Sequence, residues 1–489
     1  MAMHLLLLDP DSKTTLQRQI CEQLGQAIIK GHIPEDVPLP SSRKLSELLG
    51  ISRNTVILAY EQLASDNYIV SRQRSGYYVN PKITEWNFLE AKEPEASPCK
   101  VDWQTRLYST PSKQRNIVKP LDWQKYKYPF IYGQFDAEGF PLAKWRECVK
   151  DSSSSSSLKV WAPDIHGEDD SLLLNYLHTH ILPRRGVWAD PDEIMITLGA
   201  QNAIYMVTSL ALNNDSVFGV ENPGYIDAAN IAETNGATIK TLAIDDGGLI
   251  LSDELKDCDC VYVTPGHQFP TTVTLSIERR KKLLAMANEY DFIIIEDDYE
   301  SEYNFQSRPI PSLKSMDECD RVIYVGSFSK ILAPGLRLGY VVASRDMIVE
   351  LKAMRRLISR NTPRNNQRSA ALFLERGYYD AHVKKQRDLY EGRWKTMEYA
   401  LRRYMPGSSV PPTFGGTSYW VKGPDNLNCQ RLFEQAKKQD VLIEPGDMFF
   451  LDDSPKHNYF RLGYSSIAED KIESGIKILA EIINNSVSY

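Results

Sequence analysis

The residue in this sequence best suited to covalent chemistry is Lys330, in the segment VGSFSKILAPGLRLG at 325–339. It follows a predicted strand, has hydroxyl side chains before it, and precedes an arginine by seven positions. A lysine amine can form a Schiff base with an aldehyde, and Ser327 and Arg337 can hold a phosphate dianion by charge-assisted hydrogen bonds. The combination is what a pyridoxal 5′-phosphate (PLP) site needs, although no single feature is specific by itself.

A second group of polar residues, IIIEDDY at 293–299, ends another buried strand. Ligands of α/β sheets bind at the carboxyl ends of strands. Asp297 would pair with the pyridinium nitrogen of PLP, and Tyr299 would donate to the ring hydroxyl. Taken alone, an acid pair in this position is equally typical of a helix cap or a metal site. The presence of Lys330 favours the cofactor interpretation.

Three further segments follow predicted strands. The backbone N–H groups of Ala200 and Gln201, at the start of a helix, can cradle a phosphate. Tyr225 can stack on the pyridine face, or it can be an ordinary core or turn tyrosine. His267 can lie near the ring, or it can be a structural loop histidine.

The elements that would position these residues alternate between helices and short β-rich runs. The predicted strands are residues 194–197, 216–220, 260–264, 292–295, 321–325 and 338–342. Unbroken apolar strands separated by helices indicate an α/β fold with a mostly parallel sheet that has helices on both faces. The run of serines at 152–157 has low complexity and is expected to be a mobile surface loop.

The first 80 residues have a different pattern. Apolar spacing predicts a helix over 15–30, a second helix after Ser42 with Leu45, Leu48 and Leu49 on its apolar face, and a third capped by Ser52. Two short strands, 68–71 and 76–79, then flank a basic turn. Three helices followed by a hairpin indicate a winged helix-turn-helix.

A recognition helix presents its N-terminal residues to base edges in the major groove, and a wing can reach the minor groove or the backbone. The candidate DNA-binding residues are Arg43, Ser52, Arg53, Asn54, Thr55, Arg72 and Arg74. The alternative is a solvated helical module, because residues 1–80 carry eight basic and eight acidic side chains. Five of those basic residues, against three acids, nevertheless fall within 41–79, where the docking surface would lie.

Composition limits the classes of protein to which the chain can belong. The chain has 489 residues and a formal net charge of −7, so bulk attraction to polyanions is excluded and any DNA contact must be local. Seven scattered cysteines argue against a disulfide framework, and the CxC at 258–260 lacks the second pair that a metal site needs. There is no signal peptide and no apolar run that could span a membrane, so a cytoplasmic protein is expected. Recurrent prolines among charges predict a linker over 81–119 between domains at 1–80 and 120–489.

Two resemblances extend this interpretation. The stretch LPSSRKLSELLGISRNTVILAYEQL at 39–63 resembles the winged helix-turn-helix of GntR-type bacterial repressors, whose pattern makes Arg43, Arg53, Asn54 and Thr55 the DNA contacts. Residues 120–489 look like a fold-type I aminotransferase with a smaller α+β subdomain. The whole chain resembles the MocR/GabR-like GntR regulators, which join these two domains, and this resemblance implies a homodimer.

The aminotransferase resemblance also covers NYFRLG at 458–463, whose arginine would clamp a substrate carboxylate. Arg461 is therefore the candidate effector-binding residue; otherwise it is an exposed arginine at a strand end. Three features depart from the family pattern. Thr272 stands where a glycine is usual after Pro-Thr, the serine run at 152–157 has no counterpart among the family's motifs, and Asp227 puts an acid near the presumed ligand site. They leave the cofactor assignment intact but do not let the resemblance identify the ligand.

The sequence thus predicts a transcription regulator that binds an operator in double-stranded DNA and senses PLP or a small amino compound. The ligand amine would displace Lys330 from the cofactor and shift the placement of the winged helices. The alternative is a working PLP-dependent aminotransferase that carries an accessory helical module, since the catalytic groups all appear in the sequence.

Overall fold

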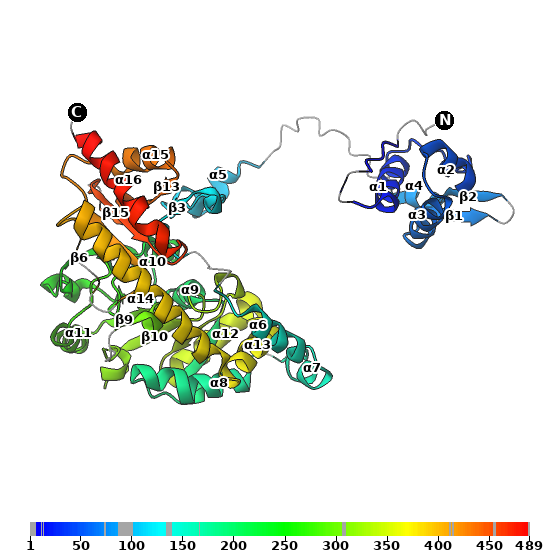
Figure 1. The fold of residues 1–489 in the computed structure, drawn as a ribbon. Coiled ribbons are helices and arrows are strands. Elements are labelled where there is room, and N and C mark those ends of the chain that lie inside the picture. Colours follow the sequence, from blue (N-terminus) through cyan, green and yellow to red (C-terminus); the bar gives the residue numbers. More distant parts are fainter. Residues whose placement is uncertain are drawn as a thin grey trace. The chain divides into compact units, whose positions relative to one another are not determined.

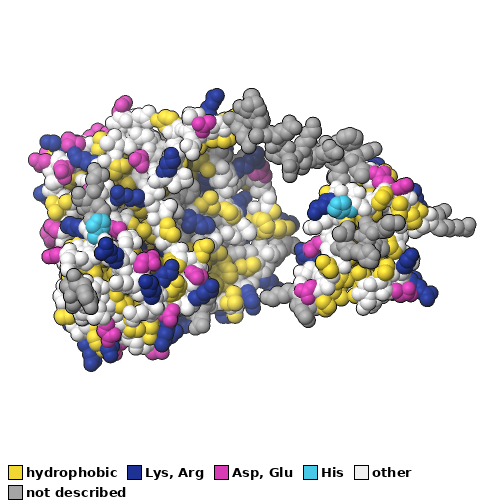
Figure 2. Space-filling model, turned by 90° about the horizontal axis from the view of Figure 1, so that it is seen from above, with side chains coloured by type: hydrophobic (Ala, Val, Ile, Leu, Met, Phe, Trp, Pro, Cys, Tyr) yellow, Lys and Arg dark blue, Asp and Glu magenta, His cyan; other side chains and the backbone are white. Residues whose placement is uncertain are grey.

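The computed structural model describes residues 6–10, 12, 14–72, 75–86, 101–133, 139–165, 167–305, 310–409, 412, 415–452 and 456–487. The chain forms two compact units that divide between Leu107 and Tyr108. Both are drawn in Figure 1, and each is described by itself below. Figure 2 shows basic and acidic side chains interspersed over the visible face, as expected from 57 basic and 64 acidic residues.

The smaller unit has the predicted helices and hairpin. Its elements are α1 (Leu16–Ile29), α2 (Ser42–Leu49), α3 (Arg53–Ser65), β1 (Ile69–Arg72), β2 (Gly76–Val79), α4 (Pro81–Trp86) and α5 (Trp103–Arg106). Ser41 and Ser52 cap α2 and α3 by accepting backbone N–H groups, and Gly50 ends α2 in the left-handed conformation that glycine adopts without strain. The apolar faces of the three main helices and the hairpin enclose one core.

One predicted core position is wrong. Leu48 is 60 % exposed, whereas Leu45 is buried and Leu49 packs against the core. Because α2 has only eight residues, Leu45 and Leu49, which are four positions apart, are enough to cover its narrow buried face. Leu48 lies beside that face, in solvent.

The larger unit is built on an eight-stranded sheet. Its strands are β4 (Ile194–Thr197), β5 (Val217–Asn222), β6 (Thr238–Asp245), β7 (Gly248–Leu249), β8 (Cys260–Val263), β9 (Ile293–Asp298), β10 (Val322–Ser327) and β11 (Gly339–Val342). The spatial order is β4-β11-β10-β9-β8-β5-β6-β7. The run from β10 to β6 is parallel, and β11 and β7 are antiparallel to their neighbours. The prediction of a mostly parallel sheet is confirmed.

Helices cover both faces of this sheet. One face packs against α9 (Ala200–Ala211), α10 (Ile226–Thr234) and α12 (Arg345–Ser359), and the other against α11 (Ile277–Tyr290). The side chains of β9 alternate accordingly: Ile293 and Ile295 pack with the first group, and Ile294 with the second. Burial on both faces explains why these strands are continuously apolar.

A smaller α+β part completes the unit. It contains the antiparallel strands β12 (Ser418–Lys422), β15 (Tyr459–Gly463) and β14 (Glu444–Pro445), and the parallel pair β3 (Tyr128–Pro129) and β13 (Val441–Leu442). Its helices are α15 (Cys429–Lys437) and α16 (Glu469–Val487), and the long α14 (Tyr378–Tyr404) runs beside α16 (Figure 1). The remaining helices are α6 (Leu142–Ser152), α7 (Ser155–Trp161), α8 (Ser171–Tyr176) and α13 (Arg364–Glu375).

Four of the six residues in the serine run lie in helices, with only Ser153 and Ser154 between them, so the prediction of a loop over 152–157 is wrong. Ser152 ends α6 with a buried side chain that contacts Ser369, and Ser154 caps α7 by accepting the N–H of Ser157. Serine is a poor helix former but a strong N-cap, so the run divides two helices instead of forming a loop.

Residues 108–119, within the predicted linker, belong to the larger unit and contact its other elements. The side-chain amide of Gln114 donates to Glu233 at 2.9 Å, and the Arg115 guanidinium donates to the carbonyl of Phe450 at 3.2 Å. The segment has a linker-like composition because it makes these contacts through polar side chains.

Candidate functional site

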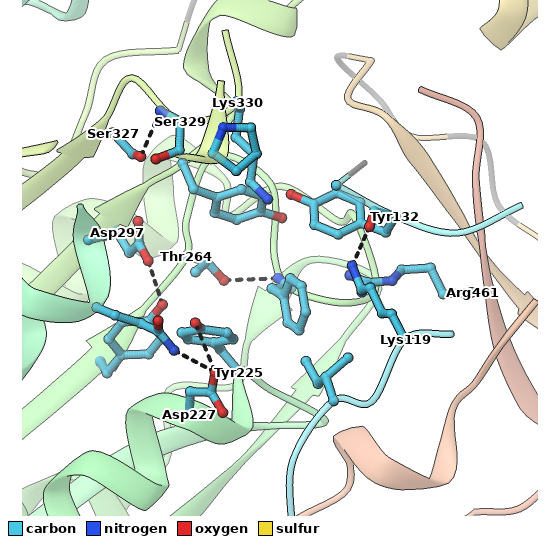
Figure 3. Close-up of a pocket in the computed structure, with 18 of the residues that line it drawn as sticks. Lys119, Tyr132, Tyr225, Asp227, Thr264, Asp297, Ser327, Ser329, Lys330 and Arg461 are labelled. Carbon is cyan, nitrogen blue, oxygen red and sulfur yellow. Dashed lines mark hydrogen bonds between the residues drawn. The ribbon is translucent and has the colours of Figure 1, made fainter. Parts of the chain in front are cut away.

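The larger unit contains a cavity of about 310 Å³ at the carboxyl ends of its parallel strands (Figure 3). Lys330 lies just after β10, Asp297 near the end of β9, and Tyr262 and Thr264 at and after the end of β8. The cavity also receives Arg461 from β15 of the smaller α+β part. Residues distant in sequence therefore meet at one edge of the sheet, where α/β folds place ligands.

The two acids that end β9 have different environments because successive side chains of a strand point to opposite faces. Asp297 faces the cavity, whereas Asp298 pairs with Arg185 at 2.7 Å and accepts the hydroxyl of Tyr324 at 2.6 Å. Asp298 thus belongs to a structural ion pair, and Asp297 is the carboxylate that a ligand can reach.

Asp297 is 5 % exposed, and only one of its oxygens has a partner. Oδ2 accepts the hydroxyl of Tyr262 at 2.8 Å, while Oδ1 is buried without a hydrogen bond. Burial raises the pKa of Asp297 to about 7, although the hydrogen bond from Tyr262 opposes the rise. A buried acceptor without a donor is costly, so this oxygen is suited to a cationic N–H donor such as the ring nitrogen of PLP.

Lys330 is shielded by the ring of Tyr132, whose centroid lies 4.4 Å from Nζ. Burial and the neighbouring cations Lys119 and Arg461 lower the pKa of Lys330 to about 8, while Glu300 and Asp297 oppose the change. A larger fraction of the amine is therefore neutral near pH 7, which is the form that can attack an aldehyde.

The residues predicted to hold a phosphate lie together around the start of α9. Ala200 and Gln201 begin α9, whose first backbone N–H groups are free of helical partners. Arg337 donates to the carbonyl of Leu198 at 2.9 Å and lies against Gly199, where a Cβ would be 3.1 Å from its Nη2. Because Gly199 also has φ +87°, a glycine is required for this close approach. Ser327 and Ser329 line the same cavity.

Not all of the aromatic residues predicted near the cofactor ring line the cavity. Tyr225 and Tyr299 line the cavity, but His267 does not and faces a separate small cavity beside Arg185 and Asp298. From the same loop, Thr264 and Phe269 face the Lys330 cavity. Burial lowers the pKa of His267, so the structure favours the structural alternative for this residue.

Two of the departures from the family pattern, Asp227 and Thr272, lie in or beside the loops of this region. Asp227 lines the cavity and accepts hydrogen bonds from Gln201 at 2.6 Å and Tyr225 at 3.2 Å. Thr272 is buried with φ +67°, in the left-handed region that a β-branched residue rarely adopts. A glycine at this position would meet no such strain.

Arg461 is buried and paired, so the alternative of an exposed strand-end arginine is wrong. It is 1 % exposed, and its Nε donates to Glu444 at 2.7 Å across the β14/β15 pair. Sequence reasoning missed Glu444, as well as Lys119 and Tyr132, which also contribute to this corner. Lys119 lay in the predicted linker, and no local pattern marked Glu444 or Tyr132.

In the smaller unit, the candidate DNA-binding residues occupy the N-termini of α2 and α3 and the hairpin. Arg43, Arg53, Asn54 and Arg72 are exposed, Ser52 caps α3, and Thr55 is half-buried beside it. Arg53 donates to Ser42 at 3.3 Å, and the Arg72 guanidinium lies 4.2 Å from the ring centroid of Tyr78. Arg74 lies outside the described residues.

Comparisons with known proteins agree with both units. The model of aminotransferase class I and II matches residues 131–479, and that of the gntR family of bacterial regulatory proteins matches residues 16–79. The transcriptional regulator TauR of Rhodobacter capsulatus is 37 % identical over 476 residues, covering 97 % of this chain and 98 % of its own. The chain belongs to the MocR-type family of GntR transcription regulators.

This MocR-type chain also resembles a named family member and solved aminotransferases. The probable rhizopine catabolism regulatory protein MocR of Rhizobium meliloti is 28 % identical, with 97 % of this chain and 95 % of the relative covered. The structure of LysN from Thermus thermophilus matches with TM-score 0.71 and 26 % identity, covering 79 % of this chain and 100 % of LysN. The kynurenine aminotransferase of Pyrococcus horikoshii matches with TM-score 0.70 and 28 % identity, covering 81 % and 99 %. The predicted family and fold class are confirmed.

Within the described residues, no helix is long and apolar enough to cross a membrane.

Proposed function

We propose that this MocR-type regulator binds PLP in the cavity around Lys330 and changes its binding to DNA when a small amine reaches the cofactor. The observation that carries the proposal is the unpaired Oδ1 of Asp297, buried in the cavity that also contains Lys330. A ligand without a hydrogen-bond donor at this point would leave the carboxylate unpartnered, whereas the protonated ring nitrogen of PLP would satisfy it.

The other residues fit the remaining parts of the cofactor. Arg337, Ser327 and the N–H groups of Ala200 and Gln201 would hold the phosphate dianion, and Tyr225 and Tyr299 would contact the ring. When bound, PLP supplies an aldehyde that condenses with amines and a ring that withdraws electrons. The solved structure of LysN, one of the fold relatives, contains N-(5′-phosphopyridoxyl)-L-leucine, which supports a phosphopyridoxyl group in this fold.

The DNA-binding part of the proposal assigns the base contacts to Arg53, Asn54 and Thr55 and backbone contacts to Arg43, Arg72 and Arg74. Exposure of the described residues at two helix N-termini and a hairpin supports the assignment, because these positions enter or flank the major groove in winged helices. We also propose a homodimer, following the family resemblance, which would match an operator with two half-sites.

A chain segment connects the proposed ligand site to the DNA-binding unit. Ile117 and Lys119 line the cavity, and they follow Leu107, the last residue of the smaller unit, by only a short stretch of chain. A ligand in the cavity would thus touch the segment that leads to the DNA-binding unit. Differential contact of this kind is what a ligand needs in order to shift the balance between two conformations.

The test of the proposal is an absorbance titration of the purified protein with PLP, followed by borohydride reduction. We expect the wild type to acquire a reducible covalent linkage and Lys330→Ala to lose it while keeping its circular dichroism spectrum. Lys125→Ala is the matched control, because Lys125 is an exposed lysine outside the cavity. A wild type that shows no such linkage after addition of PLP would contradict the proposal.

A second candidate function is amino-group transfer. It is favoured by the placement of Lys330, Asp297 and Arg461 in one cavity, as an aminotransferase requires. The discriminating measurement combines a transamination assay with DNA-binding titrations on fragments upstream of the protein's own gene. Turnover at about 1 per second or faster, without preference for any fragment over random DNA, would favour the enzyme.

A further inference from the structure

Lys330 lines two cavities. The larger is the cavity of about 310 Å³ to which we assign PLP (Figure 3), and the smaller has a volume of about 20 Å³. Gly133, Ser329 and Pro334 also line both. About 10–15 Å³ of such volume holds one water molecule, so the smaller cavity, called here the side chamber, has room for one group of that size. Its other lining residues are Glu300, Tyr303, Gln386, Tyr390, Thr417 and Ser465.

Glu300 is a buried carboxylate to which the proposed function gives no role. It is 3 % exposed, and its Oε1 accepts the hydroxyl of Thr417 at 2.5 Å. Within the part of the chain that the structure describes, neither Glu300 nor Lys330 belongs to an ion pair. A buried carboxylate without a cation is costly, so Glu300 is suited to a positive charge that enters the side chamber.

The side chamber also offers a second acceptor and a fixed backbone. The Oγ of Ser465 is buried without a partner. The hydroxyl of Tyr303 lies 2.7 Å from Oε1 of Gln386 and 2.8 Å from the backbone carbonyl of Lys330, so the chain is held at the lysine itself. An ammonium group is about as large as a water molecule and has three donors and no acceptor. It would therefore fit this chamber and its acceptors.

We propose that the side chamber receives the ammonium group of Lys330 when another amine takes its place on PLP, with Glu300 as the counter-ion and Ser465 as a second acceptor. This inference rests on the proposed function and adds Glu300 to it as a positioning residue. In the exchange, the C=N bond from the cofactor to Lys330 breaks and a C=N bond to the incoming amine forms. Two protons pass from the incoming ammonium nitrogen to the nitrogen of Lys330, so one ammonium enters and one is left behind. Glu300 stabilises the second without touching the first.

The charges that act on Lys330 favour this movement. Burial, Lys119 and Arg461 lower the pKa of Lys330 to about 8, and Glu300 and Asp297 oppose them. Lys119 and Arg461 both line the larger cavity, whereas Glu300 lines only the side chamber. Like charges repel strongly where water is excluded, so the ammonium form gains by leaving the two cations and approaching Glu300. Asp297 is assigned to the ring nitrogen of the cofactor.

The other titratable groups around Glu300 do not replace Lys330 as its partner. A Cβ on Gly416 would be 3.3 Å from Glu300 Oε2 and 3.5 Å from His267 Nδ1, so this histidine is the nearest alternative. Burial lowers the pKa of His267, which is therefore neutral near pH 7. Arg393 of α14 is engaged by the backbone carbonyl of Ser465. Burial also raises the pKa of four neighbouring tyrosines, which stay neutral: Tyr132, Tyr299, Tyr303 and Tyr464.

The experiment uses the full-length protein loaded with PLP and two different amines, propylamine and 3-aminopropanoate. After borohydride reduction, mass spectrometry measures the fraction of chains that carry the phosphopyridoxyl group, which falls as the amine displaces the lysine. Glu300→Gln removes the charge and keeps the shape, and Ser465→Val fills the side chamber. The matched controls are Glu302→Gln and Ser466→Val, at residues that line neither cavity.

At pH 6.5, displacing half of the linkage should need at least about fivefold more amine in Glu300→Gln than in the wild type, as expected if the pKa of Lys330 falls by about one unit. The factor should be equal for the two amines, because Glu300 acts on the lysine that leaves. It should vanish at pH 9.5, above the pKa of Lys330, where the lysine leaves uncharged. Ser465→Val should shift in the same direction, and both controls should match the wild type.

A second readout needs no added amine. Only the neutral lysine attacks the aldehyde, so the rate of PLP uptake by the PLP-free protein rises with pH through the pKa of Lys330. Because Glu300 raises this pKa, the midpoint should lie about one pH unit lower in Glu300→Gln and stay unchanged in Glu302→Gln.

The outcomes that overturn the inference are distinct from failure of the proposed function. Equal displacement of the wild type and Glu300→Gln at pH 6.5 would refute it, as would a loss that persists at pH 9.5, a loss confined to one amine, or an unchanged midpoint of uptake. Should Glu300→Gln not fold, Ser465→Val decides, and displacement as easy as in the wild type would refute the chamber's role. A wild type that takes up no PLP, or whose linkage neither amine displaces, would instead refute the proposed function, and this inference with it.

Discussion

Replacing Asp297 by asparagine should stabilise the protein without PLP and weaken its binding of PLP. Asparagine has nearly the same shape, and its carbonyl oxygen can still accept the hydroxyl of Tyr262, which Asp297 Oδ2 accepts at 2.8 Å. The substitution removes the charge that the fold buries, together with the acceptor that we assign to the cofactor's ring nitrogen. The two effects have opposite signs, so general damage to the fold cannot imitate them.

The magnitude follows from the pKa of Asp297, which burial raises from 3.8 to about 7. The folded state binds this proton more tightly than the unfolded state, so ionisation costs stability as the pH rises above about 3.8, and the full cost is reached above about pH 7. At ~1.4 kcal/mol per pKa unit the cost is about 4 kcal/mol. In the variant, the buried N–H group of asparagine has no partner. This costs about 1–3 kcal/mol and offsets part of the stability gained by removing the charge. The net gain should be about 1–3 kcal/mol above pH 7 and should shrink toward pH 5.

The assay is calorimetric unfolding at pH 5 and pH 8, with and without PLP. Without PLP at pH 8, the transition of the larger unit should rise in Asp297→Asn by about 1 °C per kcal/mol for a unit of this size. PLP should raise the transition of the wild type far more than that of the variant, because losing a hydrogen bond to a charged group costs about 1.5–3 kcal/mol of affinity. Asp246→Asn, at an exposed position, is the control. A variant less stable than the wild type at pH 8, or one with an undiminished response to PLP, would refute the reasoning.

The remaining predictions concern the phosphate cradle and the DNA-binding unit. Gly199→Ala should lower PLP affinity, measured by absorbance, at least about tenfold, since the new Cβ would displace Arg337 and strain a residue with positive φ. Gly335→Ala is the control and should leave that affinity unchanged, because a Cβ there meets no other atom. Asn54→Ala should cost about 1–3 kcal/mol on the specific operator and relax preference at one base position in anisotropy titrations; equal losses on every sequence would argue against base reading. Arg72→Ala should weaken binding to all sequences alike and lower the salt slope by about one; an unchanged slope would exclude a phosphate contact.

Local sequence patterns were sufficient for the three main helices and the hairpin of the smaller unit and for six of the eight strands of the large sheet, but not for β6 and β7. Serine caps and apolar spacing gave the helices of the smaller unit, because capping and burial of an amphipathic face depend on a few consecutive residues. The strand before Lys330 and the strand containing Asp297 were recognisable as unbroken apolar runs. Parallel strands align their carboxyl ends, so the placement of Lys330, Asp297 and the start of α9 in one cavity followed from the order of the elements.

Features that depend on contacts between distant segments could not be predicted from local sequence patterns. The serine run has a loop-like composition, yet Ser152 is buried against Ser369, and Leu48 has a core-like identity, yet it lies in solvent. His267 follows a cavity-forming strand, but the path of its loop turns it to another cavity. Each of these outcomes depends on which partner the fold brings to the side chain.

The sequence by itself determined the two domain types, the family, and the lysine and aspartate suited to PLP, because these depend on local patterns along the chain. Only the tertiary structure decided which charged side chains meet at the corner of the cavity around Tyr132. Glu444 pairs with Arg461 across two strands, and Lys119 reaches Glu444 from a segment whose composition is typical of a linker. Charge pairing acts through space and leaves no pattern in neighbouring residues, so the cluster of Lys119, Glu444 and Arg461 becomes visible only when the chain is folded.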